Sequence, residues 1–311
     1  MTQAEKRRTL GRIVAVATPL GAVIGFGIGL LISGTWMSAA AGAVIGLLIT
    51  AGIVAFNVSW AIGLVPRGWR ESPFLVVLVT RSLVWLLVIM IGVSLPLLTV
   101  AGRSLAGLVD RQFVVSIGAT FVVALVINFM GQVNGLLGRG VLVGLILGRY
   151  HRPREEVRVF LFIDMRESTQ IAERLGNLRY HDFLSRFIGD VTAAADRYRG
   201  EVHRYVGDEV ILTWTAKDGL RGAACVRAVF AIAAALEATR TAYVADFGIM
   251  PSFWAGLHMG PVVTGEIGTI KHEIVFLGDT MNTASRIEQA CKELQREVLA
   301  SAAVMSALDL P

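Results

Sequence analysis

Two aspartates are the residues of this sequence whose types and spacing most directly suggest chemistry. Asp164 ends a run of apolar and β-branched residues, and Asp208 follows Gly207 in a predicted hairpin turn 44 residues later. If the two tips meet, their carboxylates repel each other until divalent cations are present, which is the two-metal arrangement of phosphoryl transfer. Taken alone, Asp208 is equally well explained as an ordinary turn residue.

Asn282 and Arg286 form a second pair with chemical potential. They are four residues apart in a helical pattern and therefore lie on one helix face. An amide beside a guanidinium suits a ribose oxygen and a phosphate whose charge grows in the transition state. In isolation the same pair is typical of a solvated helix face, so its significance depends on the aspartates.

The element that must position Asp164 is the buried strand predicted over 157–163. A helical pattern follows from Ser168, with Ser168 or Thr169 as the expected N-cap. Amides at a helix N-terminus attract phosphate oxygens, and a neighbouring carboxylate can hold the cation that accompanies them. This stretch therefore predicts a phosphate and metal site at the tip of a strand.

From Glu155 onward the composition is that of a soluble α/β domain. Apolar residues at helical spacing between Tyr180 and Val191 predict an amphipathic helix. Further elements are predicted as strands at 202–206, 209–214, 252–258, 261–266 and 272–277, and as helices at 219–242 and from Asp279. Their order predicts an α+β fold in which helices pack on one face of a mainly antiparallel sheet.

The first half of the chain is too apolar for a soluble protein. Apolar residues make up 54% of the sequence and the mean hydropathy is +0.63. Apolar runs at 13–32, 38–57, 82–101 and 113–131 are each long enough, or nearly so, to cross a bilayer. The sequence therefore predicts an all-α transmembrane bundle of about four helices, with Arg81 at the interface just before the third run.

Basic residues give the expected orientation of these spans. Nine Lys and Arg residues lie at the N-terminus, in the second loop and after the fourth run, against two in the loop between the third and fourth runs. By the positive-inside rule both termini are cytoplasmic, which predicts a multi-pass protein of the inner (plasma) membrane with lipid around its spans. The predicted domains are a membrane anchor over 1–148, a linker over 149–156 and a catalytic domain over 157–311.

Composition also excludes some functions. The net charge of +5 is modest, and basic residues lie beside apolar spans rather than clustered with aromatic residues, so no nucleic-acid partner is expected. Cys225 and Cys291 lie in apolar helical contexts and are expected to be reduced, packed thiols.

Three ordered motifs resemble the class III nucleotidyl cyclase domain, the adenylate/guanylate cyclase family. They are Phe162-Ile-Asp-Met-Arg-Glu-Ser-Thr169, Tyr205-Val-Gly-Asp-Glu209 and Gly278-Asp-Thr-Met-Asn-Thr-Ala-Ser-Arg286. The resemblance covers 155–311 and implies a ferredoxin-like fold. Four hydrophobic spans before such a domain resemble bacterial membrane-anchored members of the family.

The resemblance implies a role for each site residue. Asp164 and Asp208 would bind two Mg²⁺ or Mn²⁺ ions, with the backbone carbonyl of Met165 as a further ligand. Asn282 would orient the ribose and Arg286 would stabilise the pentavalent phosphorus, while the phosphates would be cradled by Glu167, Ser168 and Thr169.

It also implies how the site is assembled and what it does. Family members are head-to-tail homodimers in which the aspartates of one chain face the asparagine and arginine of the other. The ribose 3′-oxygen would attack the α-phosphate and give a 3′,5′-cyclic nucleotide and pyrophosphate, with one metal lowering the pKa of the attacking hydroxyl and the other holding the leaving phosphates.

Three positions depart from the family pattern. The base-reading lysine is replaced by Arg204, and its partner position is Val275, for which Lys271 or Glu273 could substitute. The sequence ends at Pro311, where family domains usually continue to a phosphate-binding lysine, so it is either a fragment or lacks that contact. ATP is expected as the substrate only from its frequency in the family.

The leading hypothesis is thus a membrane-bound adenylate cyclase. A cyclase acting on GTP or a pyrimidine nucleotide, and a catalytically silent nucleotide-binding signalling module, remain as alternatives. A small transporter with a regulatory domain would rest on the apolar spans alone.

Overall fold

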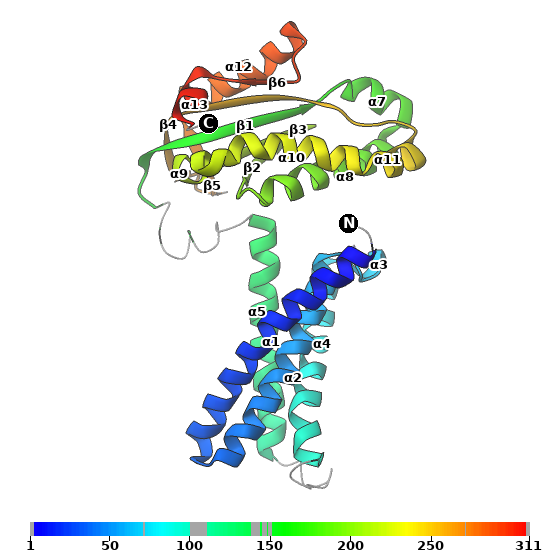
Figure 1. The fold of residues 1–311 in the computed structure, drawn as a ribbon, viewed down its shortest axis with the longest axis vertical. Coiled ribbons are helices and arrows are strands. Elements are labelled where there is room, and N and C mark those ends of the chain that lie inside the picture. The colour runs from blue at the N-terminus through cyan, green and yellow to red at the C-terminus, as the bar shows by residue number, and fades with distance from the viewer. Residues whose placement is uncertain are drawn as a thin grey trace. The chain divides into compact units, whose positions relative to one another are not determined.

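The computed structural model describes residues 3–70, 72–99, 111–137, 144, 148, 151–270 and 272–308. Two compact units divide the chain, Met1–Leu136 and Leu137–Pro311 (Figure 1). The first is helical, and the second contains a sheet with helices, which confirms the predicted fold class.

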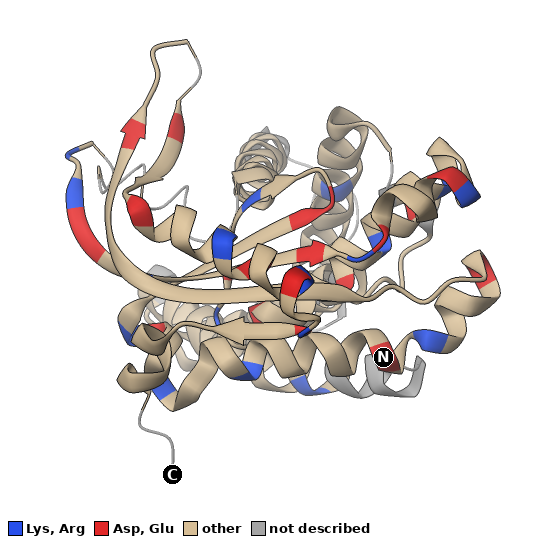
Figure 2. Ribbon diagram, turned by 90° about the horizontal axis from the view of Figure 1, so that it is seen from above, with Lys and Arg blue, Asp and Glu red and all other residues tan. Residues whose placement is uncertain are grey.

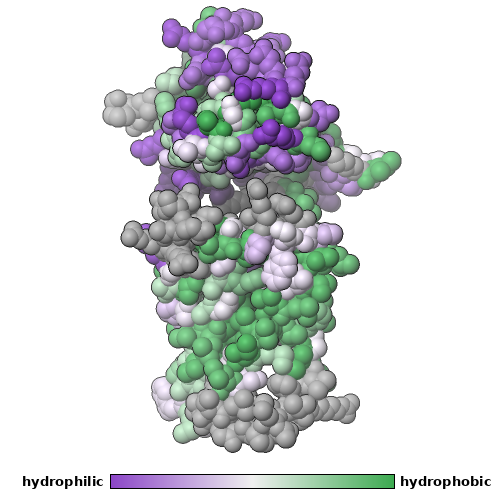
Figure 3. All heavy atoms as spheres, turned by 90° about the vertical axis from the view of Figure 1, so that its right-hand side faces the viewer, coloured by the Kyte–Doolittle hydropathy of each residue, from purple (hydrophilic) through white to green (hydrophobic). Residues whose placement is uncertain are grey.

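The helical unit consists of α1 (Gln3–Ser33), α2 (Trp36–Ala61), the short α3 (Arg67–Arg70), α4 (Phe74–Thr99) and α5 (Arg111–Leu137). Segments of four of them are long and apolar enough to cross a membrane, namely Gly11–Leu31, Trp36–Trp60, Phe74–Leu95 and Ile117–Leu137. Hydrophobic side chains cover much of the described surface of this unit (Figure 3). The predicted continuation of the fourth helix through Leu147 falls mostly outside the described residues.

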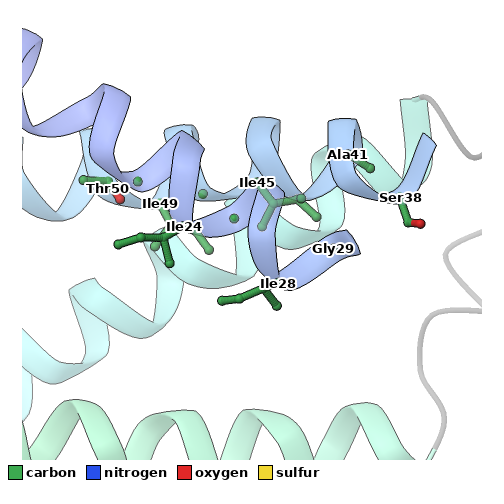
Figure 4. Close-up of a pocket in the computed structure, with 12 residues that line it drawn as sticks. Ile24, Ile28, Gly29, Ser38, Ala41, Ile45, Ile49 and Thr50 are labelled. Carbon is green, nitrogen blue, oxygen red and sulfur yellow. The ribbon is translucent and has the colours of Figure 1, made fainter. Parts of the chain in front are cut away.

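Glycines at four-residue spacing bring α1 and α2 together. A Cβ added at Gly25 would lie 3.1 Å from the Cα of Gly46, and one added at Gly29 would lie 3.0 Å from the Cα of Ala39. Small residues at such spacing let two helix backbones approach closely in a membrane. Beside this contact runs an apolar groove of about 550 Å³, into which isoleucines of both helices point (Figure 4).

Arg81 lies inside α4 rather than before the third span, because α4 begins at Phe74, eight residues earlier than the predicted run. Its Nη2 donates a hydrogen bond of 2.7 Å to the side-chain oxygen of Asn57 on α2. Its guanidinium also lies 5.0 Å from the centre of the Trp60 ring. The arginine therefore ties α4 to α2.

The sheet of the second unit has the strand order β2-β3-β1-β4-β5. The strands are β1 (Arg154–Met165), β2 (Glu201–Val206), β3 (Glu209–Thr215), β4 (Phe253–Ile267) and β5 (Glu273–Leu277), all paired antiparallel, and the short β6 (Val298–Ala300) pairs parallel with β4. β1 begins three residues earlier than predicted, within the expected linker.

Alternate residues of β1 face two different cores. Leu161 and Ile163 point to α8 (Asn177–Asp196) and α10 (Ala224–Ala238), whereas Phe160 and Phe162 pack with residues of β5 and α12 (Asp279–Leu294). This alternation follows from the two-residue period of a strand. Helices therefore cover both faces of the sheet, which corrects the expectation that all of them pack on one face.

Two glycines of β4 allow α12 to lie directly on the sheet. A Cβ at Gly256 would lie 2.7 Å from the Cα of Glu288 and 2.8 Å from the carbonyl oxygen of Ala284, both in the backbone of α12. At Gly260 the nearest atom would be the Thr280 hydroxyl at 2.6 Å. The position of α12, and of every side chain on it, depends on this contact.

Several elements differ from the prediction. The expected strands at 252–258 and 261–266 form one strand, β4. The expected helix 219–242 is divided among α9 (Ala216–Leu220), a 3₁₀ turn, α10 and α11 (Arg240–Phe247). Gly222 and Ala223 adopt left-handed conformations before α10, and Thr239 leaves the helical conformation between α10 and α11. The segment Ala216–Ala238 is apolar enough to span a membrane, but Ile232 and its neighbours on α10 are buried in the core.

Two short helices complete the second unit as described. α7 (Ser168–Leu175) follows β1, and α13 (Ala302–Ala307) follows β6.

Candidate active site

Asp164 and Asp208 come together at the tip of β1. β3 pairs with β1 so that Val210 lies opposite Ile163, and Asp208 occupies the turn just before β3. Burial raises the pKa of the Asp164 carboxyl, and the nearby Asp208 raises it further against the opposing effect of Lys292. Two residues 44 positions apart thus share one electrostatic environment, as the sequence predicts.

The segment after Asp164 forms an open pocket of about 310 Å³. Glu167 adopts a left-handed conformation (φ 58°) and is the N-cap of α7, with no side chain capping the helix amides. Ser168 is the first helical residue, which corrects its expected place as the N-cap. Uncapped amides at a helix N-terminus are suited to bind phosphate oxygens. The pocket is lined by Asp164, Met165, Arg166, Glu167, Ser168, Thr169, Gln170, Trp254 and Lys292.

Lys292 also lies at this site, although no pattern in the sequence indicated it. Its Nζ lies 2.6 Å from Oδ2 of Asp164 and 3.3 Å from Oε1 of Glu288. Burial lowers its pKa, but the hydrogen bonds and charges of Asp164 and Glu288 together outweigh burial, so the pKa of Lys292 lies above its usual value. Glu288 and Lys292 are four residues apart in the sequence, a spacing that predicts an ion pair but gives no sign of Asp164.

Two further carboxyl groups lie near the aspartates. Burial raises the pKa of Glu209 to about 7, and Asp164 and Glu288 add to this effect. Burial likewise raises the pKa of Glu288, whose residue is only 3% exposed. The carboxyl groups of Asp164, Asp208, Glu209 and Glu288 thus interact with one another near a single ammonium, that of Lys292. This excess of acidic groups favours protonation of a carboxyl group or the binding of a further cation.

The residues present fit divalent cations. Among the described residues no group of three or more His, Cys, Asp and Glu side chains is arranged to ligate one ion, so the two aspartates would be supplemented by backbone oxygen, substrate and water. Mg²⁺ commonly binds in this way, through one or two carboxylates and substrate phosphates. The ammonium of Lys292 on Asp164 shows that a cation is accommodated at this oxygen.

Asn282 and Arg286 lie on one face of α12, as predicted, and both are exposed. The same helix reaches Asp164 of its own chain through Lys292. Arg286 and Asn282 precede Lys292 by six and ten residues, which places them about 9 and 15 Å back along the helix axis. Within one chain the amide–guanidinium pair is therefore displaced along α12 from the lysine that contacts Asp164.

The predicted base-reading residues are brought together only in part. Nη2 of Arg204 on β2 lies 3.1 Å from Oε2 of Glu273 on β5, although these strands are at opposite ends of the strand order. Val275 is two residues from Glu273 and therefore shares its face of β5. Lys271, the other suggested substitute, lies outside the described residues.

Comparisons with known proteins identify the family of this part of the chain. The family model described as "Adenylate and Guanylate cyclase catalytic domain" matches residues 150–310. "Adenylate cyclase 2" of Rhizobium meliloti (strain 1021) is 42% identical over 185 residues, 60% of this chain and 51% of that protein. "Adenylate cyclase 1" of the same organism is 30% identical over 49% of this chain and 23% of its own length. The matches thus span about half or less of these relatives.

A solved structure shares the fold. "Structure of a bacterial light-regulated adenylyl cyclase" has a TM-score of 0.56 and 21% identity, and covers 65% of this chain and 61% of its own. The family match extends over the strand tip, the hairpin and α12, the three places that hold the candidate residues. The resemblance suggested by the three motifs is thereby confirmed, and the chain belongs to the adenylate and guanylate cyclase catalytic domain family.

Proposed function

We propose that this protein is a membrane-anchored adenylate cyclase that converts ATP to 3′,5′-cyclic AMP and pyrophosphate at the interface of a head-to-tail homodimer. The observation that carries the proposal is the division of the candidate site. The carboxylates of Asp164 and Asp208 converge, whereas Asn282 and Arg286 of the same chain are exposed about two to three helix turns from Lys292. A second copy is needed to complete the site.

The chain's own residues account for binding and orientation. The amides at the start of α7 and the backbone around Glu167 hold the phosphates, and Arg286 of the second copy neutralises charge that grows on the α-phosphate. Asn282 of that copy orients the ribose so that its 3′-oxygen lies in line with the bond to pyrophosphate. Two Mg²⁺ or Mn²⁺ ions at Asp164 and Asp208, with the Met165 carbonyl, would favour the deprotonated 3′-hydroxyl and neutralise the leaving group.

The reaction balances with no other reactant. A bond forms between the 3′-oxygen and the α-phosphorus, the bond from that phosphorus to pyrophosphate breaks, and the 3′-hydroxyl proton is released to solvent.

The base is read by Arg204 and Glu273 in this proposal. A guanidinium can donate to N1 of adenine, and a carboxylate can accept from the 6-amino group. The same pair offers an acceptor and a donor to guanine, so GTP is the second candidate substrate. The proximity of Val275 to this pair favours neither base, because its side chain has no hydrogen-bonding group.

The membrane half supports an anchored enzyme. Four apolar helices of the first unit would form the anchor, and the basic residues around them support a position of the catalytic unit on the cytoplasmic side of the plasma membrane. The domain limits proposed are 1–148 for the anchor and 149–153 for the linker, with the catalytic domain from Arg154, where β1 begins, rather than from 157 as expected.

Activity is tested with the full-length protein in detergent or nanodiscs. The protein is incubated with Mn²⁺ and each of ATP, GTP, CTP and UTP, and the products are identified by mass. ATP should give 3′,5′-cyclic AMP, and Asp164→Asn should abolish the formation of this product. A matched control is Asp182→Asn, because Asp182 is an exposed residue of α8. Absence of a cyclic product from all four nucleotides, with the nucleotide still bound, would instead indicate the silent binding module.

The shared site is tested by mixing two inactive variants. Asp208→Asn and Arg286→Gln each destroy both sites of a homodimer, but a mixed dimer retains one intact site. Equal co-expression should restore about a quarter of the wild-type activity, because half of the dimers are mixed and each has one working site of two. No recovery would show that each chain builds its site alone.

A further inference from the structure

The ammonium of Lys292 occupies the oxygen that a metal ion would need. It lies 2.6 Å from Oδ2 of Asp164, and its side chain is 46% exposed at the mouth of the pocket formed by the start of α7. Asp164, by contrast, is only 18% exposed. A divalent cation that uses this oxygen must therefore displace Lys292.

The displaced lysine would still face the pocket. Its backbone is fixed on α12, which is held on β4 by the contact at Gly256, while its four-carbon side chain is flexible. Glu288 lies 3.3 Å from the resting ammonium and on the same helix, but it is buried, and burial raises the pKa of its carboxyl. The other anionic group that would enter this pocket is the triphosphate of the substrate.

The second cation of the pocket is less available. The guanidinium of Arg166 lies 4.0 Å from the centre of the Trp254 ring and 3.7 Å from Glu297. Stacking on the ring fixes the plane of the guanidinium. Among the described residues that line the pocket, Lys292 therefore has the more mobile positive charge.

We propose that Lys292 is a phosphate-binding residue that rests on Asp164 in the ligand-free protein and moves to the β- or γ-phosphate when metal and nucleotide bind. The inference rests on the proposed function in that it assigns Lys292 to the same nucleotide site. It predicts that removal of the positive charge of Lys292 changes two affinities in opposite directions. The metal ion should bind more tightly because it loses a competitor for Asp164, and the triphosphate should bind more weakly because it loses a ligand.

The test uses the full-length protein with two probes that require no turnover. Mn²⁺ alone is titrated and followed by electron paramagnetic resonance of the free ion, and preformed Mn²⁺–tripolyphosphate is titrated by calorimetry. The variants are Lys292→Met, which keeps the length of the side chain, and Lys292→Arg, which keeps the charge. Lys217→Met is the control, since Lys217 is exposed just beyond the opposite end of β3, about 20 Å from the site.

Lys292→Met should bind Mn²⁺ several-fold more tightly and Mn²⁺–tripolyphosphate roughly tenfold to a hundredfold more weakly, as expected for the loss of a charged hydrogen bond. Lys292→Arg should fall between this variant and the wild type, and Lys217→Met should match the wild type with both probes. If Lys292→Met weakened both probes, the lysine would only hold Asp164 in place. Unchanged or tighter tripolyphosphate binding would equally overturn the proposal.

The two proposals can fail separately. If the wild type forms no cyclic nucleotide but Lys292→Met shows the opposite effects, the cyclase activity is refuted and the role of Lys292 stands. In a wild type that does form cyclic AMP, the same substitution should raise the KM for ATP by a similar factor.

Discussion

Gly256→Ala offers a quantitative test of how the sheet positions α12. The added Cβ would lie 2.7 Å from the Cα of Glu288 and 2.8 Å from the carbonyl oxygen of Ala284. Carbon atoms in normal contact are about 3.5–4.0 Å apart. Because the opposing atoms are backbone, the helix must retreat by about 1 Å rather than rotate a side chain.

Two losses follow from that displacement. Overpacking of this kind costs about 1–3 kcal/mol of stability, which should lower the melting temperature by roughly 2–10 °C in a unit of this size. α12 also carries Asn282, Arg286 and Lys292, and a displacement of about 1 Å at reacting groups can cost about a hundredfold in rate. Cyclic-nucleotide formation, measured well below the melting temperature, should therefore fall much further than the folded fraction.

Two other glycines serve as graded controls. Gly260→Ala would press on the Thr280 hydroxyl, a side-chain group that can rotate away from its bond to the Pro261 carbonyl, so its cost should be smaller. Gly189→Ala lies on the exposed side of α8 with no atom within 4 Å and should stabilise the protein by up to about 1 kcal/mol. A Gly256→Ala protein with the wild-type melting temperature and activity would refute the reasoning.

Three further predictions concern separate parts of the molecule. Burial, with Arg204 and Arg158, lowers the pKa of His203 to about 4; the folded state therefore binds fewer protons than the unfolded state between about pH 6.5 and 4, and stability falls as the pH drops through this range. His203→Gln lacks this loss, so its melting temperature should decline less than that of the wild type from pH 7 to 4, by the equivalent of up to about 3 kcal/mol; parallel curves would contradict the prediction. Asp208→Asn should weaken Mn²⁺ binding at least about tenfold in a resonance titration, since it removes one of two converging carboxylates; unchanged affinity would place the metal elsewhere. Gly46→Leu should destabilise the α1–α2 contact by about 1–3 kcal/mol or more, because a side chain there meets the backbone of Gly21 and Gly25; thermal aggregation in detergent measures the loss, and wild-type behaviour would argue against close packing of these helices.

The residues that bring the two aspartates together were predictable because local pattern specifies them. A continuous run of apolar and β-branched residues defines β1, and Gly207 with Asp208 defines the turn that returns β3 beside it. The placement of Asn282 and Arg286 on one face of α12 likewise follows from helical spacing. These features depend on neighbours in sequence and need no tertiary information.

The features that were missed depend on contacts between distant segments. Two strands were predicted at 252–258 and 261–266, but β4 is continuous through Pro261. This residue falls between the parts of β4 that pair with β6 and with β5, where β4 has no described strand partner other than β1. Three-residue β6 is a strand only because β4 lies beside it. Lys292 could be paired with Glu288 from spacing, but its bond to Asp164 spans 128 residues.

The two cysteines of the catalytic unit have a practical consequence. Cys225 and Cys291 are both 0% exposed, neither forms a disulfide, and burial raises the pKa of both thiols. Thiolates are the reactive form, so both side chains should resist maleimide and methanethiosulfonate reagents. A single cysteine introduced at an exposed position, such as Leu294, could then accept a spin label in the otherwise native sequence, and distances between labels in paired subunits would report directly how the two copies are arranged.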